Sequence, residues 1–226
     1  MDKEKINIGI AGTGRMGNNR AEALKKINSA DIKWIYSRST EKGEKFASKH
    51  GIPEVITDYS SGCRDSDIDG IIITTPNHIH REMTCKALDN GCNVLVEYPM
   101  SIEVEEAENM LKSAEKSDLV LHVGLTHRLS STHESVRELF KKMGEVDTCI
   151  TIMCSGNKIS RWFDNKEKIG NVILSSNYHF VDELIDWFGE VKWVDADIKE
   201  KTSTHSENKI NRDIGSVIKK IKNDIT

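Results

Sequence analysis

The stretch that decides the fold is Gly9-Ile-Ala-Gly12-Thr-Gly14-Arg-Met-Gly17, near the start of this 226-residue chain. It follows a short apolar segment and opens a helical one, which is the context in which this glycine spacing is informative. Gly12 allows a tight turn, Gly14 lets the backbone approach a pyrophosphate, and Gly17 lets the helix pack closely on the strand. The N-terminus of the helix then attracts phosphate. The stretch therefore predicts a dinucleotide-binding loop that includes Arg15 and Met16.

Strand and helix signals alternate on either side of this loop. Short apolar or β-branched runs predict strands at residues 6–11, 32–36, 71–75, 93–96 and 119–123. Amphipathic patterns predict helices at residues 19–27, 41–50, 78–90 and 101–117, with Asn77 and Ser101 as N-caps of the last two. The alternating order predicts an α/β fold, a Rossmann-type doubly wound parallel sheet, over residues 1–125.

The pattern changes after about Leu125. Helical segments at residues 131–143 and in the second half of 172–188 are interleaved with β-rich runs at 148–154 and 191–196. We therefore expect a second, α+β domain over residues 126–226. The polar tail from Lys199 offers only a few apolar anchors, so this domain is expected to be C-terminally short.

Bulk composition excludes several function classes. The net charge of −4 is mild and interspersed, so neither nucleic acid nor a membrane surface is an expected partner. No apolar run approaches the ~18 residues that span a bilayer. Five scattered cysteines without a C-x-x-C pair fit reduced thiols in a cytoplasmic protein. No set of cysteines, histidines and acids has metal-ligand spacing, so no metal is expected.

The end of the second strand predicts the cofactor. A dinucleotide-binding loop of this type is followed, about 20 residues on, by an acid that binds the ribose of NAD. Here the chain reads Ser37-Arg38-Ser39 and offers no carboxylate. Arg38 can pair with a 2′-phosphate and stack on adenine, and the two hydroxyls can add hydrogen bonds. We expect NADP(H) to be favoured over NAD(H); the alternative is a solvated loop arginine.

Further candidate residues follow the later strands, because ligands of open α/β sheets bind outside the carboxyl ends of the strands. The run Thr74-Thr-Pro-Asn-His-Ile-His80 closes one strand, and Asn93-Val-Leu-Val-Glu-Tyr-Pro-Met100 contains the next. The residues expected to contact the cofactor in these two runs are Thr75, Pro76, Asn77, His80 and Glu97.

With these motifs in order, the chain resembles the glucose–fructose oxidoreductase/inositol dehydrogenase/MocA family from residue 5 to about 197. The resemblance includes Val123-Gly-Leu-Thr-His-Arg128, Gly144-Glu-Val146 and Trp162-Phe-Asp164. It implies a Rossmann domain followed by a domain with a mainly antiparallel open sheet. It also implies an NAD(P)-dependent enzyme acting on a small-molecule substrate such as a sugar or an inositol.

The family's usual active-site motifs are altered in this chain. Its Glu-Lys-Pro is Glu97-Tyr98-Pro99 here, and its Asp-x-Gly-x-His-x-x-Asp is Ser175-Ser-Asn177-Tyr-His179-Phe-Val-Asp182. A phenol is a poor base at neutral pH but a competent acid. Biliverdin reductase, in the wider family, also carries Glu-Tyr-Pro-Met. Tyr98 is thus the first candidate for a proton donor and His179 the second; either can instead be a wall or helix-face residue.

These residues predict an NADPH-dependent reductase of a C=N, conjugated C=C or carbonyl group, with nicotinamide near Pro76, Tyr98 and His179. One alternative is a sugar or polyol dehydrogenase that uses His179 as base. Another is a catalytically disabled NADP-binding regulatory protein, because three positions depart from the family motifs.

The resemblance also implies a partner. Family members carry many more residues after the position that matches Ala196, and those residues build most of the open sheet. About thirty residues follow here, and residues 214–221 supply one strand at most. A sheet of few strands has an apolar face to cover. We expect a homo-oligomer formed through the second-domain sheet; the competing explanation is a truncated chain.

Overall fold

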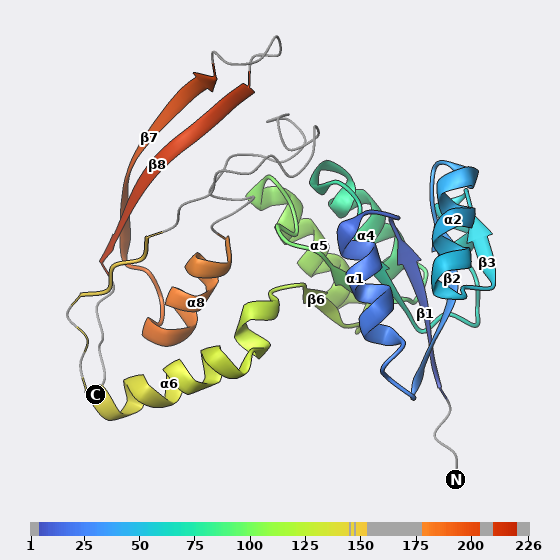
Figure 1. Cartoon of the computed structure of the whole chain (residues 1–226), viewed down its shortest axis with the longest axis horizontal. Helices are drawn as coiled ribbons and strands as arrows, with labels where there is room; N and C mark the ends of the chain where they lie inside the picture. The colour runs from blue at the N-terminus through green and yellow to red at the C-terminus, as the bar shows by residue number, and fades with distance from the viewer. Residues whose placement is uncertain (1–4, 145, 147, 153–177, 204–209, 221–226) are drawn as a thin grey trace. The chain divides into compact units, whose positions relative to one another are not determined.

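The structure, a computed structural model, describes residues 5–144, 146, 148–152, 178–203 and 210–220. The chain divides into two compact units, Met1–Gly124 and Leu125–Thr226 (Figure 1). Among the described residues, no helix is long and apolar enough to cross a membrane. Cys63, Cys85, Cys92 and Cys149 are free thiols.

The first unit is built on a six-stranded parallel sheet with the order β3-β2-β1-β4-β5-β6. Its strands are β1 (Ile6–Ala11), β2 (Ala30–Tyr36), β3 (Glu54–Ile56), β4 (Gly70–Ile73), β5 (Asn93–Val96) and β6 (Leu121–Val123). The order reverses between β1 and β4, which is the switch point where ligands of such sheets bind. The doubly wound parallel sheet expected from the sequence is confirmed.

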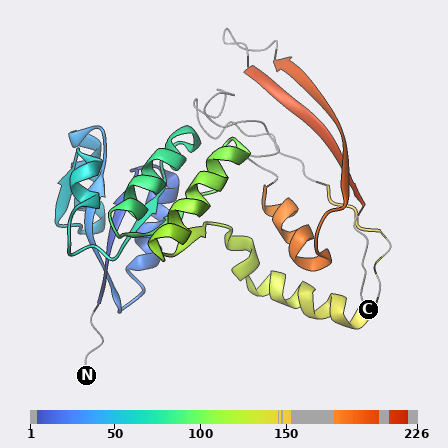
Figure 2. The same cartoon turned by 180° about the vertical axis from the view of Figure 1, so that it is seen from behind.

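Helices cover both faces of this sheet (Figure 2). They are α1 (Arg15–Leu24), α2 (Thr40–His50), α3 (Tyr59–Cys63), the short η1 (Asn77–Ile79), α4 (His80–Asp89) and α5 (Val104–Ser117). Successive residues of β4 point to opposite faces: Ile72 packs with residues of α1 and α2, whereas Ile71 and Ile73 pack with residues of α3, α4 and α5. Burial on both faces explains the unbroken β-branched run of this strand.

Two expected N-caps are wrong. Asn77 is itself the first residue of η1, which has no side-chain cap, and α4 continues directly from it. Helix α5 begins at Val104 rather than near Ser101, and the Ser101 hydroxyl instead donates to the Glu103 carbonyl oxygen at 2.8 Å. Such local side-chain hydrogen bonds compete with helical ones, so the helix starts later than its apolar periodicity suggests.

The second unit contains η2 (Thr126–Leu129), α6 (Ser131–Met143), α8 (Tyr178–Phe188), β7 (Trp193–Ser203) and β8 (Ile210–Lys220). Strands β7 and β8 form an antiparallel pair in which Trp193 is opposite Lys220. Pairing with β8 extends β7 through polar residues well beyond residue 196, the limit expected from the sequence.

The strand expected at residues 148–154 is absent from its described part, residues 148–152. Ile150 and Ile152 are 80% and 81% exposed, so this β-branched run has no packed surface on which to form a strand. The motifs expected at Trp162–Asp164 and Ser175–Asn177 lie outside the described residues.

Candidate cofactor and catalytic site

The glycine loop between β1 and α1 has the features expected of a pyrophosphate site. Gly12 has a φ of +114°, which favours glycine. Gly14 is the N-cap of α1, no side chain caps that end, and the first turn carries no acid. A Cβ added to Gly14 meets no atom within 4 Å. The loop thus leaves open space beside an uncapped helix N-terminus, and this fits a dinucleotide phosphate.

Thr74 supports this loop, and the sequence analysis did not single it out. Its backbone N–H donates to the Ala11 carbonyl oxygen at 2.8 Å. Its hydroxyl lies 3.0 Å from the same oxygen and 3.2 Å from the carbonyl oxygen of Gly12. Thr74 therefore ties the end of β4 to the turn after β1. Its place at the switch point, directly after a buried strand, was the available signal.

The loop after β2 presents Arg38 to solvent, whereas its neighbours are engaged within the loop. Ser37 is buried, and its hydroxyl donates to the Ser39 carbonyl oxygen at 2.9 Å. The Ser39 hydroxyl accepts from the N–H of Lys42 and caps α2. Of the three residues expected to recognise a 2′-phosphate, Arg38 alone has an exposed side chain.

The loops after β4 and β5 are joined by His80, which is fully buried. Its Nε2 lies 2.8 Å from the Thr75 carbonyl oxygen and its Nδ1 lies 3.0 Å from the Pro99 carbonyl oxygen. Burial lowers the pKa of His80, and the two carbonyl oxygens oppose that shift. Asn77 is also buried. These expected cofactor residues thus lie at the carboxyl edge of the sheet. His80 is buried there and holds the two loops together through its ring nitrogens.

Glu97, one of the residues expected to contact the cofactor, is buried and paired with a residue of α1. The residue is 4% exposed, and its Oε1 accepts a hydrogen bond from Nε of Arg20 on α1 at 2.6 Å. Sequence reasoning did not identify Arg20. The signal was its helical spacing: it follows Gly17 by three residues and precedes the buried Ala21, so it lies toward the face of α1 that packs on the sheet.

Tyr98 follows Glu97 at the end of β5 and is half-buried. Burial raises the pKa of its phenol above 10.0, the carboxylate of Glu97 raises it further, and Arg15 and Arg20 lower it. At neutral pH the phenol is therefore protonated and can donate a proton or a hydrogen bond. The structure brings Tyr98 within electrostatic reach of Arg15, the first residue of α1.

The second unit holds the other candidate catalytic group. His179, on α8, is 8% exposed, and its ring stacks on that of His127 with centroids 3.9 Å apart. Burial, followed by the neighbouring His127, lowers the pKa of His179 to about 4, whereas Asp182 opposes the shift. His179 is therefore a neutral imidazole at pH 7, able to accept a proton but poorly suited to donate one from the imidazolium.

Ion pairs hold this histidine pair in place. Arg128 Nε donates to Asp182 Oδ2 at 2.6 Å, and its Nη1 donates to Asp186 Oδ1 at 3.0 Å. His127 Nδ1 lies 3.2 Å from Glu183 Oε1. Asp182, the last member of the family motif, thus anchors η2 to α8. Among the described residues, no group of histidines, cysteines and acids is arranged to hold a metal ion.

The burial of His179 gives a pH-dependent stability. Its folded pKa of about 4 lies below the ordinary 6.5, so between these values the unfolded chain binds a proton that the folded chain does not. Stability is then fully present above pH 6.5 and is lost as the pH falls toward 4, by about 3 kcal/mol. Urea unfolding at pH 8 and pH 5 measures the part of this loss that falls above pH 5, about 2 kcal/mol.

The matched variant is His179→Gln, which keeps a polar side chain but does not titrate. Its difference from the unaltered protein at pH 8 gives the packing contribution alone. We expect the variant to lose clearly less stability between pH 8 and pH 5. Equal losses in the two proteins would contradict a neutral, buried His179.

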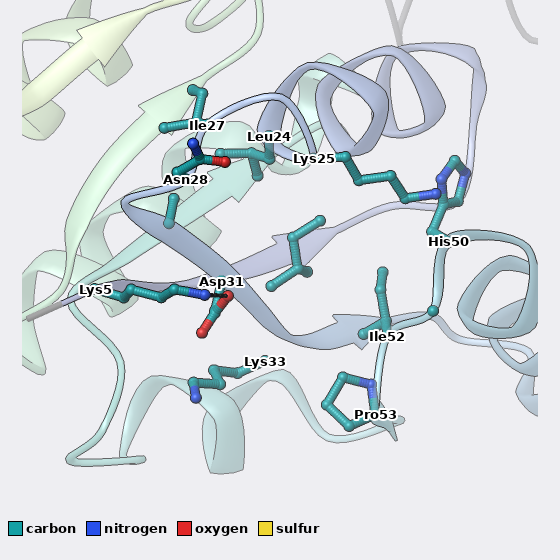
Figure 3. A pocket seen from close by; sticks show the side chains of 13 residues that line it. Lys5, Leu24, Lys25, Ile27, Asn28, Asp31, Lys33, His50, Ile52 and Pro53 are labelled. Atoms are coloured by element: carbon teal, nitrogen blue, oxygen red, sulfur yellow. Dashed lines mark hydrogen bonds and ion pairs between the residues drawn. The ribbon is translucent and has the colours of Figure 1, made fainter.

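A separate open pocket lies near the amino ends of β1 and β2, away from the carboxyl edge that holds the glycine loop. Figure 3 shows the side chains that line it. It is lined by residues before β1, at the end of α1, in the first half of β2 and before β3, including Lys5, Lys33 and His50. Lys5 pairs with Asp31 there at 2.9 Å. None of the candidate residues lies in this pocket, and the glycine loop opens at the carboxyl edge instead.

The sheet order and the glycine loop define a dinucleotide-binding Rossmann protein. Residues 6–125 match the model of the glucose–fructose oxidoreductase/inositol dehydrogenase/MocA family, described as an oxidoreductase family with an NAD-binding Rossmann fold, and the chain belongs to this family. The family expected from the motifs is confirmed.

The chain matches named relatives over part of their length. The chain is 31% identical over 131 residues to 4-carboxy-2-hydroxymuconate-6-semialdehyde dehydrogenase of a Sphingobium species, covering 58% of this chain and 42% of that protein. It is 30% identical over 142 residues to trans-1,2-dihydrobenzene-1,2-diol dehydrogenase of Xenopus laevis, covering 61% and 43%. The matched stretch thus spans less than half of the length of these relatives.

A similar fold is seen in the crystal structure of Synechocystis biliverdin reductase in complex with biliverdin and NADP+. Its TM-score is 0.78 at 23% identity, and the match covers 94% of this chain and 72% of that chain.

Proposed function

We propose that the chain is an NADPH-dependent reductase that transfers a hydride to a small-molecule C=N, conjugated C=C or carbonyl group. The observation that carries this proposal is Tyr98, a half-buried phenol at the carboxyl edge of the sheet whose pKa is raised. Reduction of such a bond needs a proton as well as a hydride, and a protonated phenol supplies it.

The residues present fit the cofactor. The glycine loop and the N-terminus of α1 would hold the pyrophosphate, because Gly14 leaves open space there. Arg38 would hold the 2′-phosphate, and Thr75 and Pro76 would border the nicotinamide end. The bound cofactor supplies the hydride. The biliverdin reductase of similar fold carries NADP+ in its crystal structure, in keeping with this assignment.

The two candidate proton donors differ in their suitability. Tyr98 keeps its proton at neutral pH and can release it to a substrate nitrogen or oxygen, or to carbon in a conjugated system, as the hydride arrives. His179, with a pKa of about 4, carries too little imidazolium at pH 7 for this task. The protonation states of the two groups at pH 7 therefore favour Tyr98 as the proton donor.

A second candidate function is oxidation of a sugar or polyol with His179 as base. It is favoured by the neutral state of His179 at pH 7, because a neutral imidazole can accept the hydroxyl proton, and it would need a substrate that raises the low pKa of this histidine. The Asp182 carboxylate raises the pKa of His179 and would stabilise the imidazolium that forms.

Absorbance of NADPH, followed across a panel of imines, conjugated enones and carbonyl compounds, tests the reductase. NADP+ reduction with sugars and polyols tests the second candidate. Native mass spectrometry of the purified protein shows which nucleotide or ligand it carries. NADPH binding without turnover in either direction would contradict both enzymes and favour an NADP-binding regulatory protein.

Cofactor preference is a separate expectation. Arg38 is the exposed cation at the end of β2, and a charge-assisted hydrogen bond contributes about 1.5–3 kcal/mol. NADPH should therefore bind more than roughly tenfold tighter than NADH. Arg38→Ala should remove this preference, and Ser37→Asp with Arg38→Ala should reverse it. Fluorescence titration with both cofactors gives the dissociation constants.

The matched control is Lys33→Ala, which removes a cation in the middle of β2, beside the pocket of Figure 3. It should keep the NADPH preference. Equal affinities for both cofactors in the unaltered protein would contradict the role of Arg38. The small-molecule substrate and a second subunit on the β7–β8 sheet stay predictions.

A further inference from the structure

Arg20 and Glu97 form a largely buried ion pair between α1 and the end of β5. The Arg20 and Glu97 side chains are 16% and 6% exposed, and the Nε–Oε1 distance is 2.6 Å. The helix in this pair is the one whose N-terminus adjoins the glycine loop. The strand is the one that ends in Tyr98. The pair thus joins the predicted cofactor loop to the predicted proton donor.

The pair is sealed by Gly124. A Cβ at Gly124 would lie 2.7 Å from Arg20 Nη2 and 3.0 Å from Glu97 Oε2. Those two atoms have no hydrogen-bond partner among the described residues. The N–H of Gly124 donates to the Val96 carbonyl oxygen at 2.8 Å, which holds its backbone against β5. The space beside the pair therefore exists only because residue 124 has no side chain.

This arrangement is a poor device for stability alone. Desolvating two charges costs several kcal/mol per ion, and their attraction offsets this cost only when the remaining donors and acceptors are satisfied. Here one atom of each partner is not. Two apolar side chains of similar volume would pack this space at least as stably.

We propose that Arg20 and Glu97 are positioning residues that anchor the Tyr98 loop to α1 and set the electrostatic environment of its phenol, in a space that Gly124 keeps open. Both partners are linked to Tyr98: Glu97 precedes it in the chain, and Arg20 holds Glu97 through the ion pair. The inference rests on the proposed function only in giving Tyr98 a chemical task.

The two charges act on the phenol in opposite directions. Glu97 raises the pKa of Tyr98, because a nearby carboxylate disfavours the phenolate, and Arg20 lowers it. Glu97→Met should therefore move the titration of Tyr98 to lower pH, whereas Arg20→Met should move it to higher pH. If the pair served packing alone, the two substitutions would not shift the pKa of Tyr98 in opposite directions.

The experiment uses the full chain with ¹³C-labelled tyrosine. The Tyr98 resonance is assigned by its loss in Tyr98→Phe, and its titration is followed by NMR in the unaltered protein, Arg20→Met, Glu97→Met and the double variant. Each single variant should melt at a clearly lower temperature, because it leaves one charge buried and alone. The double variant should recover most of that loss.

The double variant tests whether the ion pair positions the Tyr98 loop. Although its melting temperature recovers, its Tyr98 resonance should broaden or move toward that of free tyrosine, since the loop has lost its anchor. NADPH affinity, measured by fluorescence, should also fall. Gly124→Ala should reproduce these changes. The control for a glycine substitution elsewhere in the first unit is Gly91→Asn, because Gly91 has a φ of +86°, which asparagine tolerates better than alanine, and open space around its Cβ.

The inference is overturned if the double variant keeps the melting temperature and the Tyr98 resonance of the unaltered protein. Shifts of the same sign in the two single variants would also overturn it. None of these readouts needs a substrate. Failure of the reductase assay with opposite titration shifts intact would refute the proposed function and leave the positioning pair standing.

Discussion

Tyr98→Phe should lower turnover by about 10²–10⁴-fold, the usual contribution of general-acid assistance. Phenylalanine keeps the ring in the half-buried position after β5 and removes only the phenolic O–H. Packing should therefore change little, and the loss should appear in turnover. The measurement is NADPH oxidation with whichever substrate the panel identifies, at saturating cofactor.

The control for this variant is cofactor binding. The dissociation constant for NADPH should stay within a factor of about two, well below the tenfold change that ~1.4 kcal/mol would cause. His179→Gln is the matched variant in the second unit. If Tyr98→Phe keeps full turnover while His179→Gln loses it, Tyr98 is a wall residue and the dehydrogenase that uses His179 as base becomes the better assignment.

Gly17→Ala should destabilise the folded chain even without cofactor. A Cβ at Gly17 would collide with the Gly12 carbonyl oxygen and come within 3.1 Å of Thr74 Oγ1. In a helix interior, alanine is favoured over glycine by about 1 kcal/mol. Overpacking a rigid backbone costs about 1–3 kcal/mol, so the collision should win. Urea unfolding of the cofactor-free protein measures the difference.

Gly14→Ala is its matched partner and should behave in the opposite way. Gly14 has a φ of −76°, which alanine adopts readily, and its added Cβ meets no protein atom. Folding stability should therefore fall by no more than about 1 kcal/mol, the cost of alanine in place of glycine at an N-cap. NADPH affinity should fall more than roughly tenfold, because the methyl group takes the space that the backbone leaves for a pyrophosphate. Equal NADPH affinity in Gly14→Ala and the unaltered protein would contradict the assignment of this loop as the pyrophosphate site.

Local sequence determined the first unit because its signals are short-range. The glycine spacing predicts a tight turn, and Gly12 has a positive φ in that turn, which favours glycine. The β-branched run before Thr74 forms a strand buried on both faces. These features depend on neighbouring residues and on burial, which composition and periodicity report. The parallel sheet, the family and the position of the glycine loop were therefore predictable.

Helix starts and the absence of a strand at residues 148–152 were not predictable in the same way. Ser101 has the composition of an N-cap, yet its hydroxyl bonds to a nearby carbonyl instead. The run near Ile150 has the composition of a strand, yet it has no pleated surface against which to pack. Both outcomes depend on which partner a group finds in three dimensions, and propensity alone does not contain this information.

What only the tertiary structure decided is the set of side chains that meet across long stretches of chain. Glu97 in sequence is an acid at a strand end; in the fold it pairs with Arg20, 77 residues away, beneath the loop that carries Tyr98. His179 in sequence is one histidine on a helix; in the fold burial and then the stacked ring of His127 lower its pKa and make it a neutral group. Protonation states and ion pairs of this kind depend on desolvation and on residues that are distant in the sequence. The order of residues alone therefore does not determine them.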